Sequence, residues 1–210
     1  ADSTKTLDVD GGTIKLDGNY PTGTANVALG DAALDDGSLS GSYNTALGAA
    51  SFGNLTSGTA NLAVGAYAGQ NHTTGSYNVF VGQEAAVGNT TGSFNTAVGR
   101  TALYSNTTAS NNTAVGYQAG YSNTTGTRNT YMGNGSGYSN STSNDSSAFG
   151  QNSQNATTGT TNSSFGASSL RANTSGANNT SLGGYSMRLN TTGSSNVAVG
   201  RDALYSNTTA

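Results

Sequence analysis

The stretch NTAVGYQAGYSNTTG, residues 112–126, has near copies along most of the 210-residue chain. Aligning these copies on the glycine of NTAVG places one such glycine every 16 to 18 residues, most often every 17. The aligned glycines are Gly30, Gly48, Gly65, Gly82, Gly99, Gly116, Gly133, Gly150, Gly166, Gly183 and Gly200. So regular a period predicts a repeat architecture in which each unit packs on its neighbours.

Other positions of the repeat are nearly as constrained as the glycine. Asparagine stands four residues before it in ten of the eleven copies, and an apolar residue stands directly before it in every copy. We expect these positions to form structural columns along the stack, with asparagine amides hydrogen-bonded from one repeat to the next. Representative column residues are Asn95, Val98, Gly99, Asn112, Val115 and Gly116.

Each repeat has the pattern of a short strand, a glycine corner, a second short extended piece and a polar turn. Helix is disfavoured because glycine, asparagine, threonine and serine dominate the repeat. The sequence therefore predicts an all-β protein, a parallel β-solenoid or β-roll of about eleven 17-residue coils over residues 20–210. Residues 1–19 are predicted to form an N-terminal cap or connector with short strands.

The two faces of the predicted strand carry different residues. Alternation places Thr113 and Val115 on one face and Ala114 on the other. The alanine face is restricted to small residues in most copies, which favours close contact with another copy of the chain. The inter-chain candidates are Ala97, Ala114 and Ala198. A second interpretation is that alanine merely suits a tight corner.

The threonine and valine columns compensate each other in volume. Phe149 and Phe165 are the largest residues of the valine column. Their strands carry the smallest residues of the threonine column, Ser147 and Ser163. Because close packing conserves volume, we expect the two columns to share one packed cavity.

The composition offers little material for catalysis. Only 8% of the residues are charged, cysteine is absent, and Glu84 is the only glutamate, without an evident partner carboxylate. The one histidine, His72, is predicted to be a solvated residue of the polar turn, and no second histidine could complete a zinc site. We therefore expect no enzymatic activity and no cofactor or metal.

The charge and hydropathy patterns also bear on partners. The net charge of -3 provides no basic stripe for nucleic acid, and no apolar run reaches the roughly 20 residues that a membrane helix needs. Four tyrosines, each five residues after an aligned glycine, form a candidate surface ridge for sugar or protein contact. An aromatic rib between chains is the equally weighted alternative. The four are Tyr104, Tyr121, Tyr138 and Tyr205.

Two further patterns recur in the polar turn. Asn-x-Thr triplets, such as those at Asn89, Asn106 and Asn123, are potential glycan acceptors in a secreted protein. Threonine pairs such as Thr107 and Thr108 recur in register, and stacked threonines could order water.

The strings NTAVGxxAG and NVAVGRDAL resemble the SVAIGxxS repeat of YadA-like heads in trimeric autotransporter adhesins. The longer pattern NTAVGxxALxSNTTGxx resembles the low-complexity repeats of phage tail-fibre and virion-fibre proteins. The resemblance covers residues 20–210, although the period is longer than that of the adhesin heads. It implies a homotrimeric fibre on a virion or in the extracellular space, and a role in attachment.

The first functional hypothesis is a structural fibre segment, either shaft or adhesive head, of an extracellular or virion surface appendage. Its expected partners are further copies of itself, as a trimer or another homo-oligomer, and a host-surface glycan or protein. The alternative is a subunit of a self-assembling extracellular filament that stacks end to end. A lesser alternative is an ice-binding β-solenoid.

Overall fold

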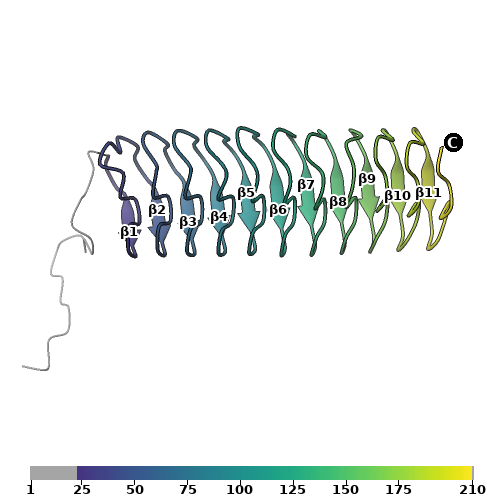
Figure 1. The fold of residues 1–210 in the computed structure, drawn as a ribbon, viewed down its shortest axis with the longest axis horizontal. Coiled ribbons are helices and arrows are strands. Elements are labelled where there is room, and N and C mark those ends of the chain that lie inside the picture. Colours follow the sequence, from purple (N-terminus) through teal and green to yellow (C-terminus); the bar gives the residue numbers. More distant parts are fainter. Residues whose placement is uncertain (1–22, 210) are drawn as a thin grey trace, which may run out of the picture.

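The computed structural model describes residues 23–209, in which one parallel sheet of eleven short strands runs along a rod (Figure 1). The strands are β1 (Val27–Leu29), β2 (Thr45–Leu47), β3 (Leu62–Val64), β4 (Val79–Val81), β5 (Thr96–Val98), β6 (Thr113–Val115), β7 (Thr130–Met132), β8 (Ser147–Phe149), β9 (Ser163–Phe165), β10 (Thr180–Leu182) and β11 (Val197–Val199). The described residues contain no helix, so the predicted all-β parallel solenoid is confirmed. The cap expected for residues 1–19 lies outside the described residues.

Each strand pairs with the equivalent strand of the neighbouring repeats and with no other. The register follows the sequence period, since Ala97 of β5 pairs with Ala114 of β6, seventeen residues later. Paired strands lie about 4.8 Å apart, so eleven rungs make a sheet roughly 50 Å long. We use rung for the three-residue strand of one repeat.

The glycine column forms the corner directly after each strand. Gly99 and Gly116 have φ angles of 136° and 133°, in the range that side chains rarely adopt. A Cβ atom on Gly116 would lie 2.7 Å from the carbonyl carbon of Gly133 in the next coil. Glycine is therefore required here both by its φ angle and by the close approach of the next backbone.

The asparagine column before the strand is buried and forms the predicted ladder. The backbone N–H of Asn112 donates to Oδ1 of Asn95 in the preceding coil, at 2.9 Å. Nδ2 of Asn112 donates to the carbonyl of Gly126 in the following coil, at 2.8 Å. One side chain thus satisfies a backbone donor on one side and a backbone acceptor on the other, which a buried segment needs.

The prediction of a second extended piece after the glycine corner is wrong. This segment forms turns in which left-handed residues alternate with others, as at Thr101 and Leu103, with φ angles of 54° and 50°. Its backbone still bonds to the next coil, because the N–H of Leu103 donates to the carbonyl of Ala119 at 2.9 Å. The far side of the rod is therefore held by hydrogen bonds between coils without a second sheet.

The alanine column lies inside the coil, so the expected inter-chain role of these alanines is wrong. Ala97 and Ala114 have no exposed surface and Ala198 has 3%. The flanking Thr113 and Val115 point away from the interior and are only partly buried. They therefore line no internal cavity. The physical reason is the narrow coil, which has room for little more than a methyl group beneath the middle of most rungs.

Two aromatic residues in the alanine column are accommodated by glycines on the opposite wall. A Cβ on Gly69 would lie 2.8 Å from the ring of Phe80. Tyr131 lies against both Gly120 and Gly137, where added Cβ atoms would come within 2.7 Å and 2.3 Å of its ring. The core therefore conserves volume between the strand centre and the turn segment opposite.

We expect Gly116→Ala to lower the free energy of unfolding by at least ~2 kcal/mol, because the methyl group meets the next coil's backbone at a strained φ angle. Gly37→Ala is the matched control, since a Cβ there would meet no atom within 4 Å. Urea unfolding followed by circular dichroism measures both variants. Equal stability of the two would contradict the stacking requirement.

Candidate functional site: the surfaces of the rod

A second buried asparagine ladder runs through the polar turns. Nδ2 of Asn106 donates to Oδ1 of Asn89 at 2.7 Å, and Nδ2 of Asn123 donates to Oδ1 of Asn106 at 2.9 Å. All three side chains are fully buried, so the folded rod leaves no room for a glycan on them. This ladder was not predicted, because NTTG has the composition of an exposed turn, although its asparagine recurs with the period of the repeat.

His72 occupies one position of this second ladder and is fully buried, so its assignment as a solvated turn residue is wrong. Its ring packs against those of Phe52 and Phe80, at centroid distances of 5.5 Å and 5.7 Å. Nδ1 accepts from the Asn89 amide at 2.9 Å, which places the proton on Nε2, and Nε2 donates to the Gly75 carbonyl at 2.9 Å. Burial lowers the pKa of His72 to about 4, against the weaker opposing effect of these hydrogen bonds.

Three of the four candidate ridge tyrosines form a stack. The rings of Tyr104 and Tyr121 lie 4.9 Å apart and those of Tyr121 and Tyr138 lie 5.1 Å apart, each pair nearly parallel. Desolvation in the stack, with its two tyrosine neighbours adding to the effect, raises the pKa of Tyr121. Because the rings cover one another's faces, the stack offers ring edges and hydroxyl groups to a partner rather than open faces for a sugar ring.

Tyr205 lies apart from this stack, in a cluster with arginine. Nη1 of Arg188 donates to the Tyr205 hydroxyl at 2.7 Å. The guanidinium carbon of Arg188 lies 5.8 Å from the Tyr205 ring centre and 5.4 Å from that of Tyr185. The predicted ridge is therefore two separate features, the tyrosine stack and this arginine–tyrosine cluster.

The paired threonines of the polar turn have different environments. The first of each pair bonds to the next coil, as where Oγ1 of Thr107 donates to the carbonyl of Thr124 at 3.1 Å. The second, such as Thr108, is exposed. The hydroxyl groups of the second threonines therefore form the one column of the pair that does not donate to the backbone of the next coil.

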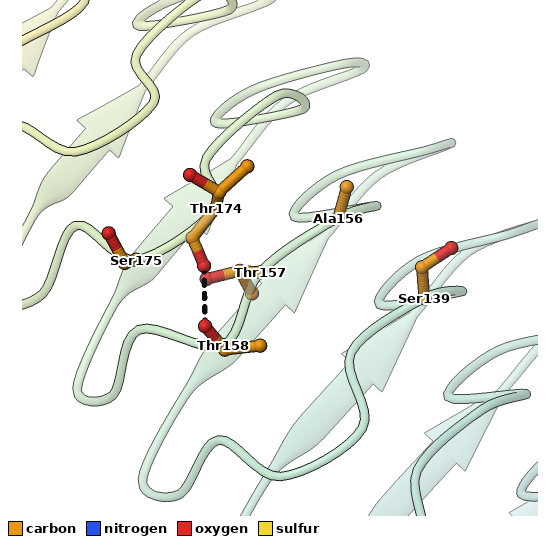
Figure 2. A pocket seen from close by; sticks show the side chains of 6 residues that line it. All are labelled: Ser139, Ala156, Thr157, Thr158, Thr174 and Ser175. Carbon is orange, nitrogen blue, oxygen red and sulfur yellow. Dashed lines mark hydrogen bonds between the residues drawn. The ribbon is translucent and has the colours of Figure 1, made fainter.

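A shallow pocket of about 280 Å³ lies on the polar-turn side of the rod, where the repeat is one residue short. Figure 2 shows its small lining side chains, and Oγ1 of Thr158 donates there to the carbonyl of Thr174 at 2.7 Å. The sequence TTG at 157–159 replaces the usual NTTG, so the pocket marks the missing residue. Its lining contains no charged group: it is formed by Ser139, Ala156, Thr157, Thr158, Thr174 and Ser175.

The outward sheet face consists of the first and third residues of β1–β11. Its first column is Val27, Thr45, Leu62, Val79, Thr96, Thr113, Thr130, Ser147, Ser163, Thr180 and Val197. Its second column is Leu29, Leu47, Val64, Val81, Val98, Val115, Met132, Phe149, Phe165, Leu182 and Val199. No charged residue occurs in either column. Met132 and Phe165 remain 39% exposed although each lies between flanking rungs.

Residues 23–209 contain neither a metal-binding cluster nor a candidate membrane helix. No group of three or more histidine, cysteine or carboxylate side chains lies close enough to hold a metal ion within this range. The same residues include no helix with the length and apolar character to cross a membrane.

We expect the stability of the chain to fall between pH 7 and pH 4 because of His72. Well above pH 6.5 the imidazole is neutral in both the folded and the unfolded state and contributes no pH dependence. Below that value the unfolded chain binds a proton that the folded core excludes until about pH 4, which costs about 3 kcal/mol over this range.

His72→Asn supplies the control, because asparagine occupies this position in other coils. Urea unfolding at pH 7, 5.5 and 4 should show a larger loss of stability for the wild-type chain than for the variant. An identical pH dependence of the two chains would disprove the burial effect.

No protein-family model, curated protein or solved structure matches this chain.

Proposed function

We propose that this chain is a rigid segment of a surface fibre, either its shaft or an adhesive head, that projects from a virion or a cell and serves in attachment. The observation that supports this most is the unbroken rod, in which all strands from β1 to β11 pair in sequence order. Because each coil contacts only neighbouring coils, repetition lengthens such a rod without changing its cross-section. A rod of this kind holds a tip away from the surface that bears it.

The use of polar side chains supports a structural role. Asn95 and Asn112 bond the coils to one another through a buried ladder, and Thr107 donates to the backbone of the next coil. His72, the one histidine, is enclosed in the core with both ring nitrogens engaged. In this chain, polar side chains of the kinds that bind ligands or catalyse reactions in other proteins connect one coil to the next.

Partners follow from the same proposal. The chain associates with further copies of itself, in the homotrimeric arrangement that the resemblance to adhesin heads implies. The stacked tyrosines, with a row of hydroxyl groups, are a contact surface for a host glycan or protein. The stacking of Tyr104 on Tyr121 favours recognition by hydrogen bonds at the ring edges over stacking on a sugar ring.

Antibodies raised against the chain should label appendages on intact virions or cells of its source in electron microscopy, and should reduce attachment to the host surface. Labelling that appears only after lysis would contradict the proposal. Negative-stain images of the purified chain address the alternative, because long filaments formed by this chain alone would favour end-to-end stacking.

Ice binding is the lesser candidate, favoured only by the flat, uncharged outward sheet face. The threonine pairs do not provide a two-column array, since the first hydroxyl of each is used within the stack. We therefore expect no thermal hysteresis from the purified chain in a nanolitre osmometer. A measurable freezing-point gap that Thr113→Lys abolishes would favour ice binding over the fibre.

A further inference from the structure

We propose that the outward sheet face binds a second copy of the chain, with each rung facing the same rung of its partner about an axis parallel to the rod. The proposal deepens the proposed function and rests on it, because it names the surface that joins the rods of the fibre. Assemblies of two or of three copies both satisfy this geometry.

The chemistry of the face favours a protein partner over water. Its columns hold valine, leucine, methionine and phenylalanine beside threonine and serine, without a charged residue along eleven rungs. Charged side chains interspersed over a surface oppose the association of soluble proteins, and this face has none of them. The second column is apolar at every rung, and an apolar stripe that extends along the rod is typical of an interaction site.

Two adjacent rungs show volume compensation across the face. Phe149 shares its rung with Ser147, and Phe165 shares its rung with Ser163. A surface bathed in water has no reason to conserve the volume of a pair, because water fills any shape. A packed surface does have that reason, since overpacking and voids both cost stability. At these two rungs the compensation therefore points to a partner packed against the face.

The compensation also favours the in-register arrangement. A two-fold axis parallel to the rod places Ser147 opposite the partner's Phe149, so that each crossing pairs a small residue with a large one. An axis perpendicular to the rod would place β8 opposite the partner's β4. Phe149 would then face valine while Ser147 also faced valine, which leaves unequal gaps across one rung.

The area of the face is sufficient for association. Eleven rungs of three residues span roughly 50 Å by 10 Å, so a pair of copies covers about 1,000 Å² in total. This is near the lower limit for specific protein interfaces. Each rung presents two uncharged side chains to the partner, so every one of the eleven rungs can contribute to the contact.

The first test measures the mass of the wild-type chain by sedimentation equilibrium at micromolar concentration. We expect two or three times the 20.8 kDa chain mass. Val115→Lys places an unpaired charge in the interface and should raise the dissociation constant by about two orders of magnitude or more. Thr108→Lys, at an exposed position outside the face, is the matched control and should leave the mass unchanged.

A second set of variants tests the volume argument. Ser147→Phe places two phenylalanines in one rung and should weaken association. Adding Phe149→Ser to it restores one large and one small residue, and should restore the wild-type mass. Failure of the double variant to recover, with an unchanged circular dichroism spectrum, would overturn the volume argument.

The register is tested by disulfide formation, because the chain contains no cysteine of its own. Under a mild copper–phenanthroline oxidant, chains with Thr180→Cys should cross-link to chains with Leu182→Cys. A reversed arrangement would instead cross-link Thr180→Cys to Thr45→Cys, since the tenth rung would face the second. That second result overturns the in-register geometry.

These outcomes distinguish a failure of the proposed interface from a failure of the proposed fibre function. A wild-type chain that is monomeric, with a rod-shaped scattering profile, overturns the interface and the homotrimeric association, and leaves the role of a surface-fibre segment to the antibody experiment. An in-register oligomer that labels no surface appendage overturns the proposed function and leaves the interface in place.

Discussion

The close stacking of one glycine corner on the next is the constraint on which the rod depends. At Gly116 the following backbone lies where a side chain would begin, so the distance between coils there is set by the backbone alone. The strands then pair residue for residue, and the turn segments bond to their neighbours on the far side. The other columns are aligned along the rod because this contact fixes how one coil stacks on the next.

A coil this narrow places asparagine columns in the interior and a column of large apolar residues on the surface. Alanine and asparagine recur through the interior beside a few large apolar residues such as Phe52, Phe80 and Tyr131, and the asparagine amides satisfy the backbone groups that a buried turn exposes. Valine, methionine and phenylalanine lie on the outward sheet face instead. Residues that form the core of an ordinary domain are thus available to join one rod to another.

The sequence allowed the repeat, the parallel register, the glycine corners and the first asparagine ladder to be predicted, because each recurs with one period. The face of each strand that points into the coil could not be predicted in the same way. Alternation separates Ala114 from Val115 but does not say which of them faces inward, and hydropathy favours the wrong answer. The burial of His72 was missed for a similar reason, since a polar residue in a polar turn appears solvated until the second ladder is seen.

The sequence by itself determined that equivalent residues stack, since a 17-residue period with glycine at one phase permits few other arrangements. The tertiary structure decided which columns are core and which are surface, because that depends on the width of the coil. The width is set by the alternating left-handed turns after each glycine, at residues such as Thr101 and Leu103. These residues carry no local signal for that conformation, which is held by hydrogen bonds between coils.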